Sequence, residues 1–136
     1  MISDKMYLEA EQAGIIVDCA VELPETKSMS LNIDNHMFIG IDDTAMQTRA
    51  EERVHLAHEL GHCMTGAFYS LYSPIDNRGY MERQANVYAI KKLIDEDELK
   101  KVIKEYDCNI APWELAEHFG VTEKFMRMAL KYYLGD

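Results

Sequence analysis

The sequence contains little cysteine. Its three cysteines, Cys19, Cys63 and Cys108, are odd in number and widely spaced, and no CxxC pair occurs. A disulfide framework or a metal cage of thiolates is therefore not expected, and reduced thiols are the simplest interpretation. Cys63 directly follows His62, but one step along a helix turns a side chain by about 100°. We therefore interpret Cys63 as a packing residue rather than a metal ligand.

Positive charge and long apolar runs are also scarce. The chain has 14 Lys and Arg against 24 Asp and Glu, a formal net charge of −10, so nucleic-acid binding is not expected. No uncharged apolar segment approaches the roughly 20 residues that span a bilayer. Residues 1–12 lack the basic stretch and apolar run of a secretory signal, and we expect a cytoplasmic protein.

The rest of the composition is that of a folded protein, with 48% apolar and 28% charged residues in 136 positions, enough for one domain. Ser3 can cap a first helix that stops near Gly14. Three segments are expected to form strands: residues 15–23, 28–34 and 37–42. Between the last two, Asn35 and His36 are expected to form a hairpin turn.

Helical patterns fill the remainder of the chain. They are expected from about residue 48 to 68, over 81–94, from about 95 to 106, and in a pair of helices that starts at Pro112. A looser stretch, residues 69–79, with Pro74 and Gly79, interrupts them. In the third of these helices, an apolar stripe is expected from Leu99, Val102, Ile103 and Tyr106. One helix, a small sheet and then helices describe an α+β domain.

The segment HLAHELGHC, residues 55–63, carries the main chemical signal. His58 and His62 are four residues apart, so on a helix both imidazoles can bind one ion. Glu59 is rotated off that line, where it can take a proton from a water molecule on the metal without binding the metal. Gly61 is expected to leave room around the ion. This is the H-E-x-x-H motif of zinc metallopeptidases.

A catalytic zinc ion needs a third protein ligand, and Glu82, twenty residues after His62, is the candidate. Asn86 lies one helical turn further on. Its side-chain oxygen could accept the second N–H of a zinc-bound histidine. The alternative is that Glu82 and Asn86 are surface residues and that both histidines only pack.

The pattern resembles that of the gluzincins, typified by thermolysin, with asparagine where aspartate is usual. More closely, the chain resembles the ImmA/IrrE family of small metallopeptidases. The resemblance covers five segments: AGIIV, FIGID, LAHELGH, ERQANVYA and ELAEHFGVTEKFMRMAL. It implies a minimal zincin-like domain, with a zincin core at about 1–94 and a helical, helix-turn-helix-like extension at about 95–136.

The resemblance also implies roles for particular residues. His58, His62 and Glu82 would hold zinc, and Glu59 would be the catalytic base. Members of the family are cytoplasmic, are often encoded beside phage-type or mobile-element repressors, and relieve repression by cutting the repressor. A helix-turn-helix-type repressor is therefore the expected protein substrate.

Other residues are secondary candidates for a role in the site. His55 is on the same helical face but about 10 Å from His62 along the axis, so a place in the cleft wall or a hydrogen bond is expected rather than ligation. The donor for a developing oxyanion is left open among five side chains: Tyr69, Tyr72, Tyr80, His36 and His118. Strand 37–42 is expected to be an edge strand that pairs with extended substrate.

The C-terminal segment has the spacing of a helix-turn-helix, but its charges from Pro112 onward are three positive against four negative. A structural or partner-binding helical pair is therefore favoured over DNA recognition. Four of its apolar side chains are expected in the core or an interface rather than a ligand pocket: Met126, Met128, Tyr132 and Tyr133.

Three functions are compatible with these observations. The favoured one is a zinc-dependent endopeptidase. The second is a regulatory module that binds a repressor or toxin without cutting it, with structural or vestigial zinc. The third is a DNA-binding regulator that uses the terminal helices.

Overall fold

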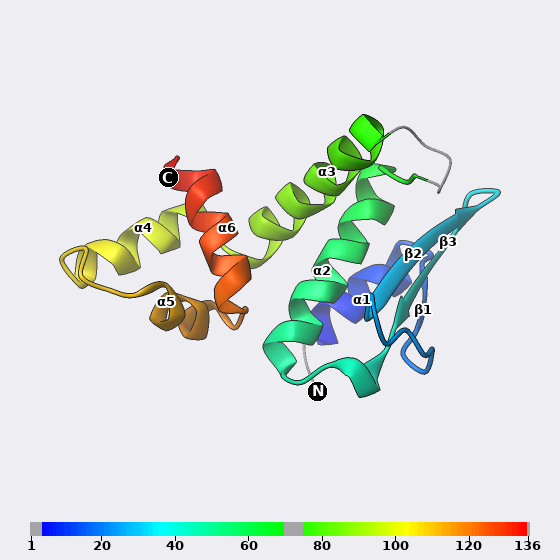
Figure 1. Ribbon diagram of the computed structural model, residues 1–136, viewed down its shortest axis with the longest axis horizontal. Helices are drawn as coiled ribbons and strands as arrows, with labels where there is room; N and C mark the ends of the chain where they lie inside the picture. The colour runs from blue at the N-terminus through cyan, green and yellow to red at the C-terminus, as the bar shows by residue number, and fades with distance from the viewer. Residues whose placement is uncertain (1–3, 70–74, 136) are drawn as a thin grey trace.

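The computed structural model describes residues 4–69 and 75–135, and these form a small sheet and six α-helices (Figure 1). The elements are α1 (Asp4–Gln12), β1 (Ile16–Asp18), β2 (Ser28–Ile33), β3 (His36–Ile41), a short 3-10 helix η1 (Asp43–Ala45), α2 (Arg49–Thr65), α3 (Ile75–Leu93), α4 (Glu96–Glu105), α5 (Pro112–Phe119) and α6 (Glu123–Leu134). The expected α+β class is confirmed. The expected cap at Ser3 lies outside the described residues.

The sheet has the order β1-β3-β2, with β1 parallel and β2 antiparallel to β3. Strand β3 is therefore the central strand, and the prediction that residues 37–42 form an edge strand was wrong. The edge strand that lies against α2 is β2. The first expected strand, residues 15–23, was too long, because only Ile16–Asp18 pairs continuously and Ala20 makes one isolated bridge to Asp42.

The hairpin between β2 and β3 turns one residue earlier than expected. Ile33 pairs with His36, so the two turn residues are Asp34 and Asn35, with φ of 52° and 68°. Aspartate and asparagine tolerate this left-handed conformation better than most residues, and two such residues in succession are typical of a type I′ turn. His36 is already part of β3.

Helix α2 begins after Thr48, whose side chain accepts a hydrogen bond from the Glu51 N–H, and ends at Gly66, which has a φ of 74°. Helix α3 packs along it (Figure 1). It starts at Ile75 and includes Gly79, so the looser stretch is shorter than predicted. Residues 70–74, with Pro74, lie outside the described part.

Helices α4, α5 and α6 lie on the other side of α2 and α3 from the sheet (Figure 1). The apolar stripe of α4 is shorter than predicted, because Leu99 and Val102 are buried whereas Tyr106 follows the helix and is 55% exposed. One buried core nevertheless joins all layers. Its largest members include Ile39 and Ile41 of β3, Leu56 and Leu60 of α2, Ile90 of α3 and Met126 of α6.

Among the described residues, no helix has the length and apolar character needed to cross a membrane.

Candidate metal centre

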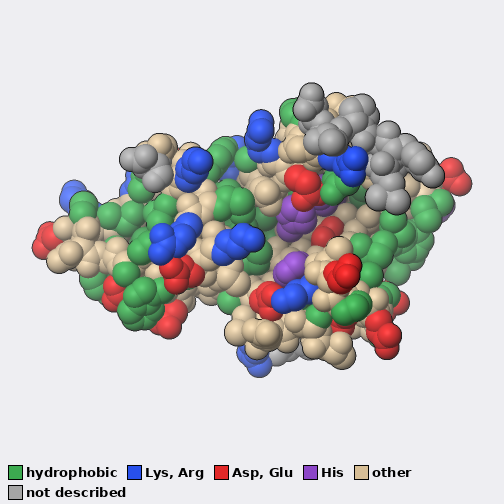
Figure 2. All heavy atoms as spheres, viewed as in Figure 1, with side chains coloured by type: hydrophobic (Ala, Val, Ile, Leu, Met, Phe, Trp, Pro, Cys, Tyr) green, Lys and Arg blue, Asp and Glu red, His purple; other side chains and the backbone are tan. Residues whose placement is uncertain are grey.

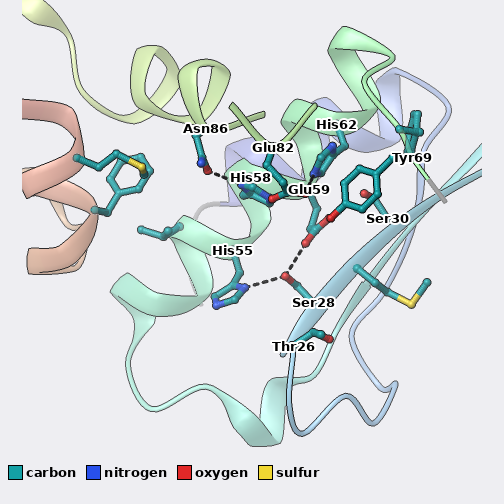
Figure 3. Close-up of a pocket in the computed structure, with 15 residues that line it drawn as sticks. Thr26, Ser28, Ser30, His55, His58, Glu59, His62, Tyr69, Glu82 and Asn86 are labelled. Carbon is teal, nitrogen blue, oxygen red and sulfur yellow. Dashed lines mark hydrogen bonds and ion pairs between the residues drawn. The ribbon is translucent and has the colours of Figure 1, made fainter. Parts of the chain in front are cut away.

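Three side chains from α2 and α3 converge on one point. Glu82 places one carboxylate oxygen 3.0 Å from His58 Nε2 and the other 3.0 Å from His62 Nε2 (Figure 3). One possible ligand atom from each of the three residues lies within 4.8 Å of the others. The structure therefore brings together the three residues that the sequence singled out as ligands.

The second nitrogen of each imidazole fixes how the ring is turned. His58 Nδ1 lies 2.8 Å from Asn86 Oδ1, and His62 Nδ1 lies 2.6 Å from the Ala67 carbonyl oxygen. A backbone carbonyl only accepts, so His62 Nδ1 carries a hydrogen atom and donates it. Asn86 contacts His58 as the sequence suggested, whereas the contact with Ala67 was not foreseen.

This arrangement suits a cation. The Nε2 atoms face a carboxylate, which also only accepts when it is ionised, so either protons or a positive ion must lie between them. Two imidazole nitrogens and one glutamate oxygen are a ligand set that catalytic zinc sites use, with the outward nitrogens hydrogen-bonded as seen here. The residues present fit a zinc ion.

The electrostatics of the three side chains reflect the same contacts. Hydrogen bonds from His58 and then His62 hold the pKa of Glu82 well below its usual range. Burial lowers the pKa of His62, but the hydrogen bonds with Glu82 and the Ala67 carbonyl outweigh burial, and the net shift is upward. A carboxylate that stays ionised between two imidazoles is a good partner for a divalent cation.

Glu59 lies next to these ligands but is not part of the group. Its side chain is buried, and its Oε2 atom accepts a hydrogen bond of 2.7 Å from Ser28 Oγ, at the start of β2. Ser28 Oγ is also 2.7 Å from His55 Nδ1 (Figure 3). The predicted hydrogen-bonding role of His55 thus has a specific partner. Ser28 itself was missed, because nothing in a short alternating strand distinguishes one serine from another.

The three candidate ligands, His58, His62 and Glu82, face a cleft of about 580 Å³ between β2, α2, α3 and α6. Figure 2 shows histidine side chains, with acidic side chains beside them, in the middle of this face. Met29 and Ser30 of β2 line one side, while Phe125 and Met128 of α6 line another. Met128, expected in the core or an interface, packs partly buried against the core and also contributes to the cleft wall. Helix α6 therefore helps to form the site.

Of the five candidate donors for an oxyanion, Tyr69 lines the cleft. The pKa of Tyr69 is raised to about 12, mainly by burial and next by a hydrogen bond with Glu82. Tyr80 is not among the residues that line the cleft; it is 54% exposed and accepts a hydrogen bond from Gln84. Two others lie elsewhere: His36 begins β3, and His118 pairs with Glu98. Tyr72 lies outside the described residues.

Comparison with known families agrees with this geometry. Residues 10–131 match the IrrE N-terminal-like domain, Peptidase_M78. The chain belongs to this family. The resemblance to ImmA/IrrE metallopeptidases is thereby confirmed, and a metallopeptidase-type domain is shown. No curated protein and no solved structure matches the chain. Peptidase_M78 domains are metal-dependent, and the group of His58, His62 and Glu82 is the candidate site in the described part of this one.

Proposed function

We propose that this Peptidase_M78 domain is a zinc-dependent endopeptidase in which His58, His62 and Glu82 hold the ion and Glu59 is the general base. The observation that carries the proposal is the Glu82 carboxylate, 3.0 Å from the Nε2 atoms of both histidines, with Glu59 beside the group on the same helix as the histidines. Zinc, when bound, would polarise the peptide carbonyl and make a water molecule more acidic.

The chain supplies the proton transfer. Glu59 Oε2 is engaged by Ser28, so its other carboxylate oxygen is the one to accept a proton from the attacking water. The same carboxyl group can then give that proton to the leaving amine nitrogen, which restores Glu59 to its starting state. Burial of Glu59 keeps this carboxylate out of bulk water.

Tyr69 is the proposed donor to the developing oxyanion. It lies in the cleft with Glu82, and its raised pKa keeps the phenol protonated near neutral pH. A protonated phenol can donate a hydrogen bond to the carbonyl oxygen as negative charge builds up on it.

The free edge of strand β2 favours a protein substrate that binds in an extended conformation. The Asp42 N–H donates to the Lys27 carbonyl, so by the alternation of an antiparallel ladder Met29 and Leu31 also bond to β3. Ser30 then turns its N–H and C=O toward the open edge beside the cleft. An extended segment could add to this edge as a further strand. We propose that the segment belongs to a helix-turn-helix-type repressor of a phage or mobile element, as the family resemblance suggests.

The test is co-expression with the repressor-like proteins encoded near the gene, followed by measurement of their masses. The parent chain is expected to cut one of them at a defined bond, whereas Glu59→Gln should bind the same protein and leave it whole. A chelator should stop the parent. If parent and Glu59→Gln both bind the partner and neither cuts it, the chain is the non-cleaving regulatory module instead. Cleavage that survives both Glu59→Gln and the chelator excludes the zinc mechanism.

A further inference from the structure

We infer that Ser28, which is itself hydrogen-bonded to His55, is a positioning residue for Glu59. Through Ser28, the edge strand β2 and the general base are held as one unit. The inference rests on the proposed function, because positioning matters only if Glu59 transfers protons. Both contacts of Ser28 Oγ are 2.7 Å long (Figure 3). In the sequence, His55 lies 27 positions and Glu59 lies 31 positions after Ser28.

The direction of these hydrogen bonds follows from the chemistry of the groups. The hydroxyl of Ser28 has a single proton, and the ionised carboxylate of Glu59 can only accept. Ser28 therefore donates to Glu59 and accepts from His55, whose Nδ1 carries the hydrogen atom. A neutral histidine is sufficient for this. Burial is the largest influence on His55 and lowers its pKa, which favours the neutral form.

Three polar residues of α2 contact Lys27 or Ser28, where β2 begins, and they share one helical face. Glu51, His55 and Glu59 are spaced four residues apart, so they lie one above another. Glu51 forms an ion pair with Lys27, and the other two share Ser28. Lys27, just before β2, and Ser28, its first residue, are thus fastened to the helix that carries the base and both histidine ligands.

Ser28 is 6% exposed, and Glu59 is also 6% exposed. A buried carboxylate that loses its hydrogen-bond donor can turn to another rotamer or admit water, because an unpaired buried acceptor is costly. With Ser28 in place, Oε2 is occupied and the remaining oxygen has a defined direction. If β2 shifts, Glu59 moves with it. The general base would therefore keep its position relative to a substrate that is paired with β2.

The first test uses the purified protein and needs no substrate. Urea unfolding is measured for Ser28→Ala, Glu59→Ala and the double variant. Ser28→Ala is expected to lower the urea midpoint in the parent and to lower it clearly less in the Glu59→Ala background, because the partner is already gone. Equal shifts in both backgrounds would overturn the inference.

The second test uses cleavage of the partner protein. Ser28→Ala is expected to lower kcat by about 10-fold or more, within the roughly 10² to 10⁴ that a general base contributes, with KM and zinc content unchanged. Ser28→Thr retains the hydroxyl and should restore most of kcat. Tyr80→Phe is the control, since it removes an exposed hydroxyl that accepts a hydrogen bond from Gln84 and should keep parental kcat.

The two tests separate the inference from the proposed function. If the parent cuts no protein, the proposed function fails, and unfolding still decides whether Ser28 and Glu59 are coupled. If the parent cuts and Ser28→Ala cuts equally fast, the function stands and the positioning role is wrong. Loss of kcat in Ser28→Thr as large as in Ser28→Ala would also overturn it.

Discussion

Gly61 of α2 lies directly against the backbone of Ala85 of α3. A Cβ atom at Gly61 would be 2.7 Å from the Ala85 carbonyl oxygen, closer than real Cβ atoms come, and 3.0 Å from the Ala85 Cα. The sequence suggested that Gly61 leaves room around the ion, but the space is taken by α3. Because Ala85 comes three residues after Glu82 and one before Asn86, this close approach sets how near both residues come to the histidines.

Gly61→Ala is therefore expected to destabilise the protein and to weaken zinc binding. Alanine favours a helix by about 1 kcal/mol over glycine, but pushing two backbones apart typically costs about 1–3 kcal/mol and moves Glu82 away. Urea unfolding and a competitive zinc titration measure the two effects. Gly79→Ala is the control, because Gly79 is on α3 with nothing within 4 Å of the added Cβ, and it should stabilise slightly. A Gly61→Ala protein with parental stability and affinity would show that the helices do not need this contact.

The ligands could be predicted from sequence because their geometry is local. Two histidines four residues apart share a face of any helix, and Glu82 with Asn86 repeats that spacing on the next helix. Only the packing of two neighbouring helices was needed to join them. The match of those two spacings to a known family added the expected roles, and the contact distances agree with them.

Ser28 and the substrate edge could not be predicted in this way. They depend on the sheet order β1-β3-β2, in which the last strand in sequence lies in the middle. Each expected strand had the right composition, but composition does not state which neighbour a strand pairs with or which edge meets α2. The position of the hairpin turn is uncertain from sequence for a related reason. Asn35 suits a two-residue turn whether the other turn residue is Asp34 or His36.

The ligand set can be tested by metal analysis of purified variants. His58→Ala, His62→Ala and Glu82→Ala should each lose most bound zinc, because an open three-ligand site cannot spare one ligand. Asn86→Ala should weaken zinc binding by about 10-fold or more without abolishing it, since the hydrogen bond to His58 only orients the ring. Glu59→Gln should keep parental zinc. Full occupancy in Glu82→Ala would show that another residue is the third ligand.

Tyr69→Phe tests the oxyanion donor. Removing such a donor costs on the order of 10²-fold in kcat. A tyrosine donates only while it is protonated, and a pKa raised to about 12 keeps the proton on Tyr69 across the whole neutral range. The loss should therefore be the same at about pH 6, 7 and 8, well below even the ordinary tyrosine pKa. Tyr80→Phe, which removes an exposed hydroxyl bonded to Gln84, should keep parental kcat. A Tyr69→Phe enzyme with parental kcat would exclude Tyr69 as the donor.

The open edge of β2 can be tested by comparing proline substitutions at two adjacent positions, Ser30 and Leu31. Proline lacks the N–H group, and it is tolerated in an edge strand where that N–H faces away from the sheet. In β2 the ladder alternation points the Ser30 N–H outward and the Leu31 N–H toward β3. Ser30→Pro should therefore fold with near-parental stability and bind zinc, yet lose affinity for the partner protein. Leu31→Pro should instead break the ladder and lower stability by several kcal/mol, on the order of the proline cost in regular structure.

Partner affinity for this comparison is best measured in the Glu59→Gln background, where the bound protein stays whole. Circular dichroism and urea unfolding establish first that the Ser30→Pro protein is folded, so that weaker binding reports the missing N–H rather than a damaged sheet. Partner binding that is unaffected by Ser30→Pro would place the substrate elsewhere in the cleft, against α6 and its Phe125 and Met128 side chains rather than along β2.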